Sequence, residues 1–349
     1  MKTISFRAQL KGELSDFLKK EGLLSPGIEE CLLSLVNSIS PFMEEGRPLY
    51  PQVIICEDLP TTLRVLQGSN PISIGRGPIE TKTIGVALKI CAPLTQGCWV
   101  IFITISSALL EYGVFQRPFS PTALDIRDII LSLKEEGNPL KIILTNQLAE
   151  KTVELIGTSF GILNVHLSDT PDDALSPLEV LNNLIESCCS HVRREGKEQV
   201  QSFLRATLTE SLRRCHGALI AVIPEGGDPK VISEDGVFLS IPVAFSDLVA
   251  QQEAQKSDQS LSNLTAHASL IDGALNSDGV VILDSGCRLI GYRLFVHDDM
   301  RVSSPDVVQE GGARHRAYKR LCDLVDEGKI FSCFIRSSNG ISDYHDNER

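Results

Sequence analysis

The sequence predicts an α/β protein of two domains, and three observations lead to this prediction. The chain has 349 residues, enough for two cores of ordinary size. In both halves, short apolar runs typical of buried strands alternate with segments that carry apolar residues at helical spacing. A polar, Pro-containing segment at 169–173 separates the halves. We therefore predict an N-terminal α/β domain over 1–170, a helical linker over 171–202 and a C-terminal domain over 203–349 with a central mixed sheet flanked by helices.

Two helices and then a mixture of strands and helices are predicted in the first half. Apolar residues recur at helical spacing from Phe6 to Leu18, and Ser25-Pro26 is a typical start for a second helix that ends near Ile39. Further helices are expected at 123–134 and 148–156, and strands at 53–56, 72–75, 84–90, 99–105, 141–145 and 162–167.

Two other segments of the first half are predicted to be connections. Gly75-Arg76-Gly77-Pro78 lacks the Lys-Ser/Thr pair of a phosphate-binding loop, so a structural turn is expected there. The segment 111–117 follows the most pronounced strand pattern and is predicted to be an exposed connection. An interface or a ligand edge is the alternative for this segment.

The second half is predicted to begin with a long helix over 175–212, broken near Gly196. Strands are expected at 217–223, 236–243, 280–283, 289–292 and 330–335, and helices at 245–268 and 317–325. A turn at 336–340 and a polar tail at 343–349 close the chain. This half therefore has the strands of one mixed sheet and enough helix to cover it.

Composition and charge argue against several classes of protein. The net charge of −12 is unfavourable for general binding to nucleic acid or to an anionic membrane. The longest apolar run, 98–110, is shorter than the ~20 residues that a membrane-spanning helix requires. No apolar signal-peptide core follows Met1. We therefore expect a soluble, cytoplasmic protein with no membrane or nucleic-acid partner.

The ten cysteines do not form a recognisable metal site. None of them make a C-x-x-C pair, and Cys188-Cys189 has no second pair nearby. We expect reduced thiols that act mostly as small core residues.

The residues with the clearest chemical character lie between 270 and 316. This stretch opens with Leu270-Ile271-Asp272-Gly273-Ala274 and closes with Gly311-Gly312-Ala313-Arg314-His315-Arg316. An acid on a Gly-Ala turn can hold a divalent cation through oxygen ligands. Glycines let backbone N–H groups approach phosphate, and arginines offer planar, charged forks that match it. The pattern is suited to phosphate chemistry.

These two motifs resemble the paired DGA and GTRHR signatures of the diadenylate cyclase (DAC) domain. The DAC domain is found in the DNA integrity scanning protein and its relatives, which make cyclic di-AMP. The likeness covers about residues 203–345. It depends on the order of the two motifs and on the strands between them. Taken singly, each motif residue is more often structural.

The resemblance implies a nucleotidyltransferase, a diadenylate cyclase that condenses two ATP into cyclic di-AMP and two pyrophosphates. Asp272 would hold Mg²⁺ or Mn²⁺ and help polarise the attacking hydroxyl. Arg314, His315 and Arg316 would complete the catalytic set by contacting phosphate or ordering the loop. Because each site handles one ATP, the resemblance implies a homo-oligomer with DAC-like domains face to face. The nucleotide-binding residues would be Leu270, Gly273, Ala274, Gly291, Gly312, Ala313, Ser337 and Ser338.

Three departures from the family pattern leave a second hypothesis open. Ala313 replaces the family's threonine, and extra residues occur at about 297–310. The family's Ser-Glu-Glu after the last strand reads Arg336-Ser337-Ser338 here, which removes a metal-binding glutamate unless Asp278, Asp284 or Asp343 substitutes. The alternative is therefore a catalytically weak or inactive nucleotide sensor that binds ATP or a cyclic dinucleotide. An interaction scaffold with a vestigial pocket is a third class.

Overall fold

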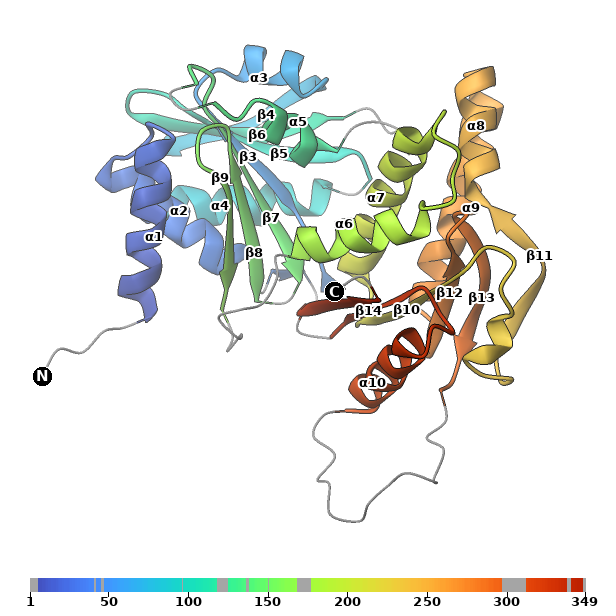
Figure 1. The fold of residues 1–349 in the computed structure, drawn as a ribbon. Helices are drawn as coiled ribbons and strands as arrows, with labels where there is room; N and C mark the ends of the chain where they lie inside the picture. The colour runs from blue at the N-terminus through green and yellow to red at the C-terminus, as the bar shows by residue number, and fades with distance from the viewer. Residues whose placement is uncertain are drawn as a thin grey trace, which may run out of the picture. The chain divides into compact units, whose positions relative to one another are not determined.

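The computed structural model of the chain describes residues 6–40, 42–44, 47–95, 97–117, 125–135, 138–149, 151–167, 177–296, 312–337 and 340–347. The chain forms two compact units that divide near residue 170. Each unit contains one mixed sheet with helices on both of its faces (Figure 1). The predicted α/β class with two domains is confirmed. Within the described residues, no helix has the length and apolar content needed to cross a membrane.

The first unit is built on a seven-stranded sheet with the order β4-β6-β5-β3-β7-β8-β9. The central strand β3 runs parallel to β5 and antiparallel to β7. The other neighbours are antiparallel. The strands are β3 (Gln52–Cys56), β4 (Ser69–Pro78), β5 (Trp99–Ile105), β6 (Leu109–Gln116), β7 (Ile142–Ala149), β8 (Thr152–Gly157) and β9 (Gly161–His166), and a separate pair is β1 (Met43–Glu44) with β2 (Arg47–Pro48).

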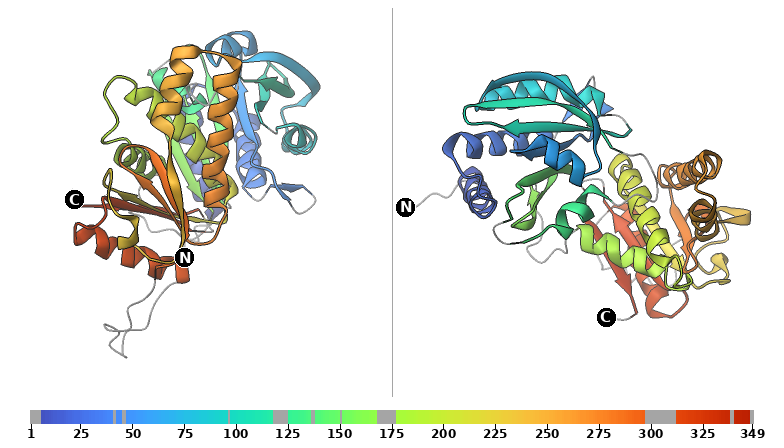
Figure 2. Two further views of the ribbon diagram at one scale, coloured as in Figure 1. Left: turned by 90° about the vertical axis from the view of Figure 1, so that its right-hand side faces the viewer. Right: turned by 90° about the horizontal axis from the view of Figure 1, so that it is seen from above.

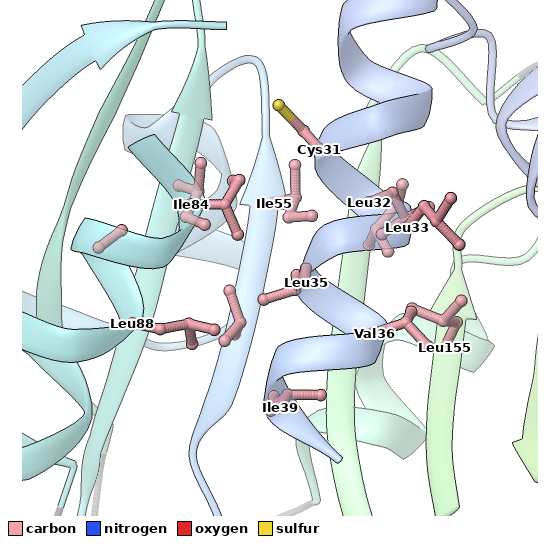
Figure 3. Close-up of a cluster of buried hydrophobic side chains, with 14 of the residues drawn as sticks. Cys31, Leu32, Leu33, Leu35, Val36, Ile39, Ile55, Ile84, Leu88 and Leu155 are labelled. Carbon is pink, nitrogen blue, oxygen red and sulfur yellow. The ribbon is translucent and has the colours of Figure 1, made fainter. Parts of the chain in front are cut away.

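Helices cover both faces of this sheet. One face packs against α1 (Phe6–Lys20), α2 (Pro26–Ile39) and α4 (Thr81–Cys91), and the short 3-10 helix η1 (Ala92–Leu94) follows α4. Figure 3 shows this core, with side chains of α2 and α4 meeting Ile55 of β3 and Leu155 of β8. The other face packs against α3 (Leu59–Val65) and α5 (Ile126–Ser132).

The second unit is built on a six-stranded sheet with the order β11-β13-β12-β10-β14-β15. Its central strand β10 runs parallel to β12 and antiparallel to β14. The remaining neighbours are antiparallel. The strands are β10 (Ala218–Ile223), β11 (Val237–Ala244), β12 (Val280–Asp284), β13 (Arg288–Leu294), β14 (Ser332–Arg336) and β15 (Ser342–Asp346).

One face of this second sheet packs against four helices and the other against one. The four are α6 (Pro177–Cys188), α7 (Lys197–Arg214), α8 (Phe245–Gln255) and α9 (Asp258–Leu275), of which α8 and α9 lie side by side (Figure 2). The other face packs against α10 (Ala313–Asp326), and the 3-10 helix η2 (Pro229–Val231) lies in the β10–β11 connection. The segment 171–202, which we predicted to be a linker, contains α6, and α6 packs in this unit's core.

The sequence patterns locate most of these elements. The Ser25-Pro26 start of α2, the strand at 99–105 and the break at Gly196 between α6 and α7 are confirmed. Gly196 has φ +103°, a conformation that favours glycine, so it separates the two helices where the sequence indicated.

Five local predictions are wrong, and each has a physical reason. Residues 84–90 belong to helix α4, because the apolar run buries one helical stripe. Residues 148–149 end β7 and 152–156 lie in β8, and Lys151 before β8 adopts a positive φ. The remaining three segments pair as strands, because long-range pairing decides between strand and coil: 75–78 lies in β4, 111–116 in β6 and 342–346 in β15.

Candidate functional site

The ends of several strands meet at one side of the C-terminal sheet, and we call this side, where β10 and β12 begin, the edge. The parallel strands β10 and β12 both begin at this edge, where Leu219 pairs with Val280. The antiparallel strand β14 ends there, where Arg336 pairs with Ala218. Chain ends at one edge of a sheet can gather polar groups that the strand interiors exclude.

Arg314 connects helix α10 to this edge. Its Nη1 donates a hydrogen bond of 3.2 Å to the carbonyl oxygen of His216, just before β10. The next residue, Gly217, has φ +123°, and a Cβ at this position would collide with the Arg314 guanidinium and lie 2.7 Å from the carbonyl oxygen of Arg336. Gly217 is therefore required for the close approach of three segments. The Arg314 side chain is half-buried and keeps part of its surface accessible.

The first turn of α10 lies beside Arg314 and has no side-chain cap among the described residues. Gly312 is the N-cap and supplies no side-chain cap, and the following Ala313 and His315 are exposed. The N–H groups of His315 and Arg316 bond to the carbonyl oxygen of Gly312. Helix N-termini carry partial positive charge and free N–H groups, which favour anions. This turn and Arg314 therefore form an arrangement that fits a phosphate group.

The Asp272-Gly273-Ala274 motif does not form the predicted turn. It lies in the last part of helix α9, and Ala274 is buried in the core. A Cβ at Gly273 would meet no atom within 4 Å, so this glycine permits no close approach. Leu270, on the same helix, has 46% of its surface exposed. Asp272 is half-buried, one helical turn before the chain leaves α9.

The acid that stands on a turn directly before a strand is Asp278. Gly279 follows it with φ +101°, and a Cβ there would lie 2.8 Å from the carbonyl oxygen of Leu294, so the turn needs glycine. Continuing the β10–β12 register two residues back places Asp278 level with Gly217, whose backbone adjoins Arg314. Adjacent strands lie about 4.8 Å apart. The Asp278 side chain is exposed and has no hydrogen-bond or ion-pair partner among the residues described.

Sequence reasoning named Asp278 only as a substitute, although a signal was present. The Asp-Gly pair stands directly before the apolar run 280–283, whereas Asp272 stands eight residues before it. The short spacing to the strand therefore marks Asp278 as the acid on the turn before β12, whereas Ala274, the third residue of the motif, favoured Asp272.

Two further predicted residues have structural positions, and a third cannot be placed. Gly291 is buried in β13, where a Cβ would lie 2.7 Å from the carbonyl oxygen of Val237, so it permits close strand packing. Ser337 closes the β14–β15 turn through bonds from its N–H and Oγ to the carbonyl oxygen of Ile341. Ser338 and the extra segment 297–310 lie outside the described residues.

Asp284 cannot serve as a substitute acid at this edge, because it lies at the other end of β12 and is fully engaged. Its buried carboxylate accepts hydrogen bonds from the N–H groups of Gly286 and Arg288 and pairs with the Arg288 side chain at 2.6 Å. The side-chain hydrogen bond to Asp284 raises the pKa of Arg288 above its usual value. This pair is structural.

Asp343, the other substitute, lies on β15 and pairs in register with Ile335. One of its carboxylate oxygens accepts the N–H of Tyr344. Its side chain is exposed.

The described residues fit a metal ion carried by a nucleotide better than a resident one. No group of three or more His, Cys, Asp or Glu side chains in the described ranges could hold a metal ion. Mg²⁺ in nucleotide sites is commonly held by one or two carboxylates together with substrate phosphates. A single accessible carboxylate such as Asp278 meets that requirement only when phosphate supplies the remaining ligands.

Comparison of the chain with protein-family models, curated proteins and solved structures found no match.

Proposed function

We propose that the C-terminal unit binds ATP at the edge where β10 and β12 begin. The observation that carries the proposal is the placement of Arg314. This residue is the second of α10, whose N-terminus has no side-chain cap among the described residues, and it donates to the backbone just before β10. Arg314 would contact a phosphate oxygen while the first turn of α10 donates N–H groups to the same group. His315 and Arg316 would adjoin the phosphate from that turn.

We assign the role of the acid to Asp278 in preference to Asp272. Asp278 stands on the turn before β12, next to the backbone segment that Arg314 contacts. A bound Mg²⁺ or Mn²⁺ would neutralise phosphate charge and polarise the attacking hydroxyl. The carboxylate of Asp278 would hold that ion from the protein side, and Gly279 would keep the turn close to β13.

The proposed reaction is nucleotidyl transfer that yields cyclic di-AMP. The 3′-hydroxyl oxygen of one ATP forms a bond to the α-phosphorus of a second ATP, the bond to the β-phosphate oxygen breaks, and pyrophosphate leaves with the hydroxyl proton released. A second transfer closes the ring. Positioning and charge neutralisation supply most of the acceleration in such reactions. Because one site holds one ATP, the active form would be a homo-oligomer whose C-terminal units face each other.

A nucleotide sensor without activity is the second candidate, and one observation favours it. The turn after β14 reads Arg336-Ser337-Ser338, and Ser337 is used to close that turn. The described residues of this turn therefore supply no carboxylate beside Asp278, and the next exposed acid along the chain is Asp343 on β15. Weaker metal binding would preserve nucleotide binding but slow the nucleotidyl transfer.

One experiment separates these functions. Purified full-length protein is incubated with ATP and Mn²⁺, products are identified by mass spectrometry, and ATP binding is measured by calorimetry. Cyclic di-AMP with pyrophosphate supports the cyclase. Binding without product supports the sensor. Absence of binding with either Mn²⁺ or Mg²⁺ rejects the nucleotide site and leaves an interaction scaffold.

A further inference from the structure

The two units have the same strand order, although they belong to different halves of the chain. We number the strands of each unit first to sixth along the chain, β3 to β8 in the first unit and β10 to β15 in the second. In both sheets the order across the sheet is then second, fourth, third, first, fifth, sixth. The first strand runs parallel to the third and antiparallel to the fifth in both units. The first unit differs by one added edge strand, β9.

The helices also occupy matching places. Two helices precede the first strand in each unit, and one helix (α5 or α10) joins the fourth strand to the fifth. The face of the sheet that packs against α5 corresponds to the face that packs against α10. Elements α4 and α8–α9, which join the second strand to the third, both pack on the opposite face. Order, direction and face all agree, so the first unit repeats the architecture of the second.

This correspondence matches Arg127 to Arg314. Asp125 is the N-cap of α5 and Arg127 the second helical residue; Gly312 is the N-cap of α10 and Arg314 the second helical residue. Each arginine is therefore the second residue of the helix that leads to the fifth strand. The side chains differ in surroundings, since Arg314 is half-buried while Arg127 is 4% exposed.

Two carboxylates of the first unit contact Arg127. Arg127 donates from Nη2 to Oε1 of Glu154 on β8 at 2.8 Å, and the Glu154 side chain is fully buried. The Asp125 carboxylate accepts the N–H of Arg127 at 2.8 Å, where α10 has no side-chain cap. Burial raises the pKa of Glu154, and the charge of Arg127 opposes that shift.

The buried pair retains unused bonding capacity. Nε of Arg127 has no hydrogen-bond partner within the described part of the chain, and Oε2 of Glu154 has the Asn146 side chain close enough to lower the Glu154 pKa. Their neighbours on β7 and β9, Asn146 and Asn164, each leave the side-chain oxygen without a partner as well. A pair selected only for structure would be expected to satisfy these groups, because each unmet buried group costs free energy.

The acid of the second unit has no counterpart in the first. Gly97 lies two residues before the start of β5 with φ +72°, and Gly279 lies directly before β12 with φ +101°. The residue before Gly279 is Asp278, whereas the residue before Gly97 in the sequence is Gln96. The sequence of the first unit therefore carries no acid in the residues directly before β5.

We propose that the N-terminal unit is a second copy of the C-terminal fold whose oxyanion site is closed by its own carboxylate, with Glu154 bound to Arg127 where the second unit leaves Arg314 open to a phosphate. Removing that carboxylate reopens a site for one small oxyanion at Arg127. The chain then carries one nucleotide site, so a second ATP must come from another copy of the chain; this last consequence rests on the proposed function.

The test is chemical rescue of the full-length Glu154→Ala variant. Thermal unfolding is followed in sodium formate and in sodium chloride of equal ionic strength, with inorganic phosphate as a second probe. We expect formate to raise the unfolding midpoint of Glu154→Ala saturably by about 3–6 °C, as a weak ligand at tenfold its Kd would. Wild type and the double variant Glu154→Ala/Arg127→Met should show no such gain. Equal stabilisation of all three chains, or none of Glu154→Ala, would overturn the proposal.

Two further measurements keep the proposal testable if Glu154→Ala does not fold. Glu154→Gln preserves the shape and removes the charge, and it should be less stable than the double variant Glu154→Gln/Arg127→Met, because the double variant leaves no buried charge uncompensated. If the stability losses of Glu154→Gln and Arg127→Met simply added in the double variant, the pairing of Glu154 with Arg127 would be overturned. Calorimetry of the wild type adds an independent check: two ATP sites per chain, one of them lost in Arg127→Met, would show that the first copy is open.

Discussion

Arg127 and Arg314 occupy equivalent places in two units of one architecture, yet their environments are opposite. Arg127 is buried against Glu154, and the start of its helix is capped by Asp125. Within the described part of the chain, the Arg314 side chain donates to a backbone carbonyl, and its helix has the N-cap Gly312, which offers no side-chain cap. Both units place an arginine at the second position of the helix that leads to the fifth strand. On our proposal, neighbouring carboxylates determine whether an anion can reach that arginine.

The largest expected effect is on the stability of the closed site. Arg127→Met leaves the Glu154 carboxylate buried without its partner, which typically costs about 3–5 kcal/mol. The free energy of unfolding of the first unit, measured by denaturant titration, should fall by this amount. The matched control is Arg314→Met, a substitution at the half-buried counterpart, which should cost about 0.5 kcal/mol or less. Equal losses at the two positions would remove the contrast between the sites.

The open site should respond in affinity instead of stability. Arg314→Ala removes a charge-assisted hydrogen bond to phosphate, worth about 1.5–3 kcal/mol, or roughly 10- to 150-fold in Kd. Calorimetry with ATP measures the change, and Arg127→Met serves as the control that should keep the wild-type Kd. An unchanged Kd for Arg314→Ala would remove this residue from the nucleotide site.

Glycine substitutions sharpen the comparison within the second unit. Gly217→Ala places a Cβ against the Arg314 guanidinium and the Arg336 carbonyl at a positive φ, and we expect a loss of about 1–3 kcal/mol in unfolding free energy. Gly273→Ala, inside α9 with free space around it, should instead gain about 0.5–1 kcal/mol. Opposite signs in the two denaturant titrations are the expected result; two losses of similar size would mean that the Asp272-Gly273 segment is itself in close contact.

The smallest expected effect is a pH dependence on the outer strand of the second sheet. Burial lowers the pKa of His345, but the hydrogen bond to Asp326 at 2.8 Å and nearby negative charges outweigh it and raise the pKa above 6.5. A raised folded-state pKa stabilises the protein below the unfolded pKa, and that contribution is lost as the pH rises through the folded pKa. The unfolding free energy of wild type minus that of Asp326→Asn should decline by less than about 1 kcal/mol across this window, because the pair is partly exposed. A flat difference would show that the pair does not contribute.

The sequence predicted the strands better than the pairings between them. β5 and β12 were found because branched apolar residues fill both of their faces. β15 was missed because its polar residues resemble coil until a neighbouring strand supplies hydrogen bonds. β6 is largely apolar and was interpreted as a connection because it directly follows another strand pattern. The ion pair of Arg127 with Glu154 spans 27 positions and depends on strand register and helix placement, which single-sequence patterns do not encode.

The candidate site was predicted in part, for a related reason. The residues at the start of α10 were located from the Gly-Ala-Arg-His-Arg motif, and a helix does begin there. Asp272 was selected because its three-letter motif matched, although helix α9 continues through it to Leu275. The end of a helix depends on capping and packing, and these are less visible in the sequence than the motif itself.

Metal-dependent ATP binding by two matched variants tests the account most directly. Calorimetry is performed on wild type, Asp278→Asn and Asp272→Asn, each with and without Mn²⁺. We predict that Mn²⁺ strengthens ATP binding in wild type and Asp272→Asn and no longer does so in Asp278→Asn, because the amide lacks the charge that a divalent cation requires. Metal dependence that survives in Asp278→Asn and disappears in Asp272→Asn would contradict the account and return the acid to helix α9.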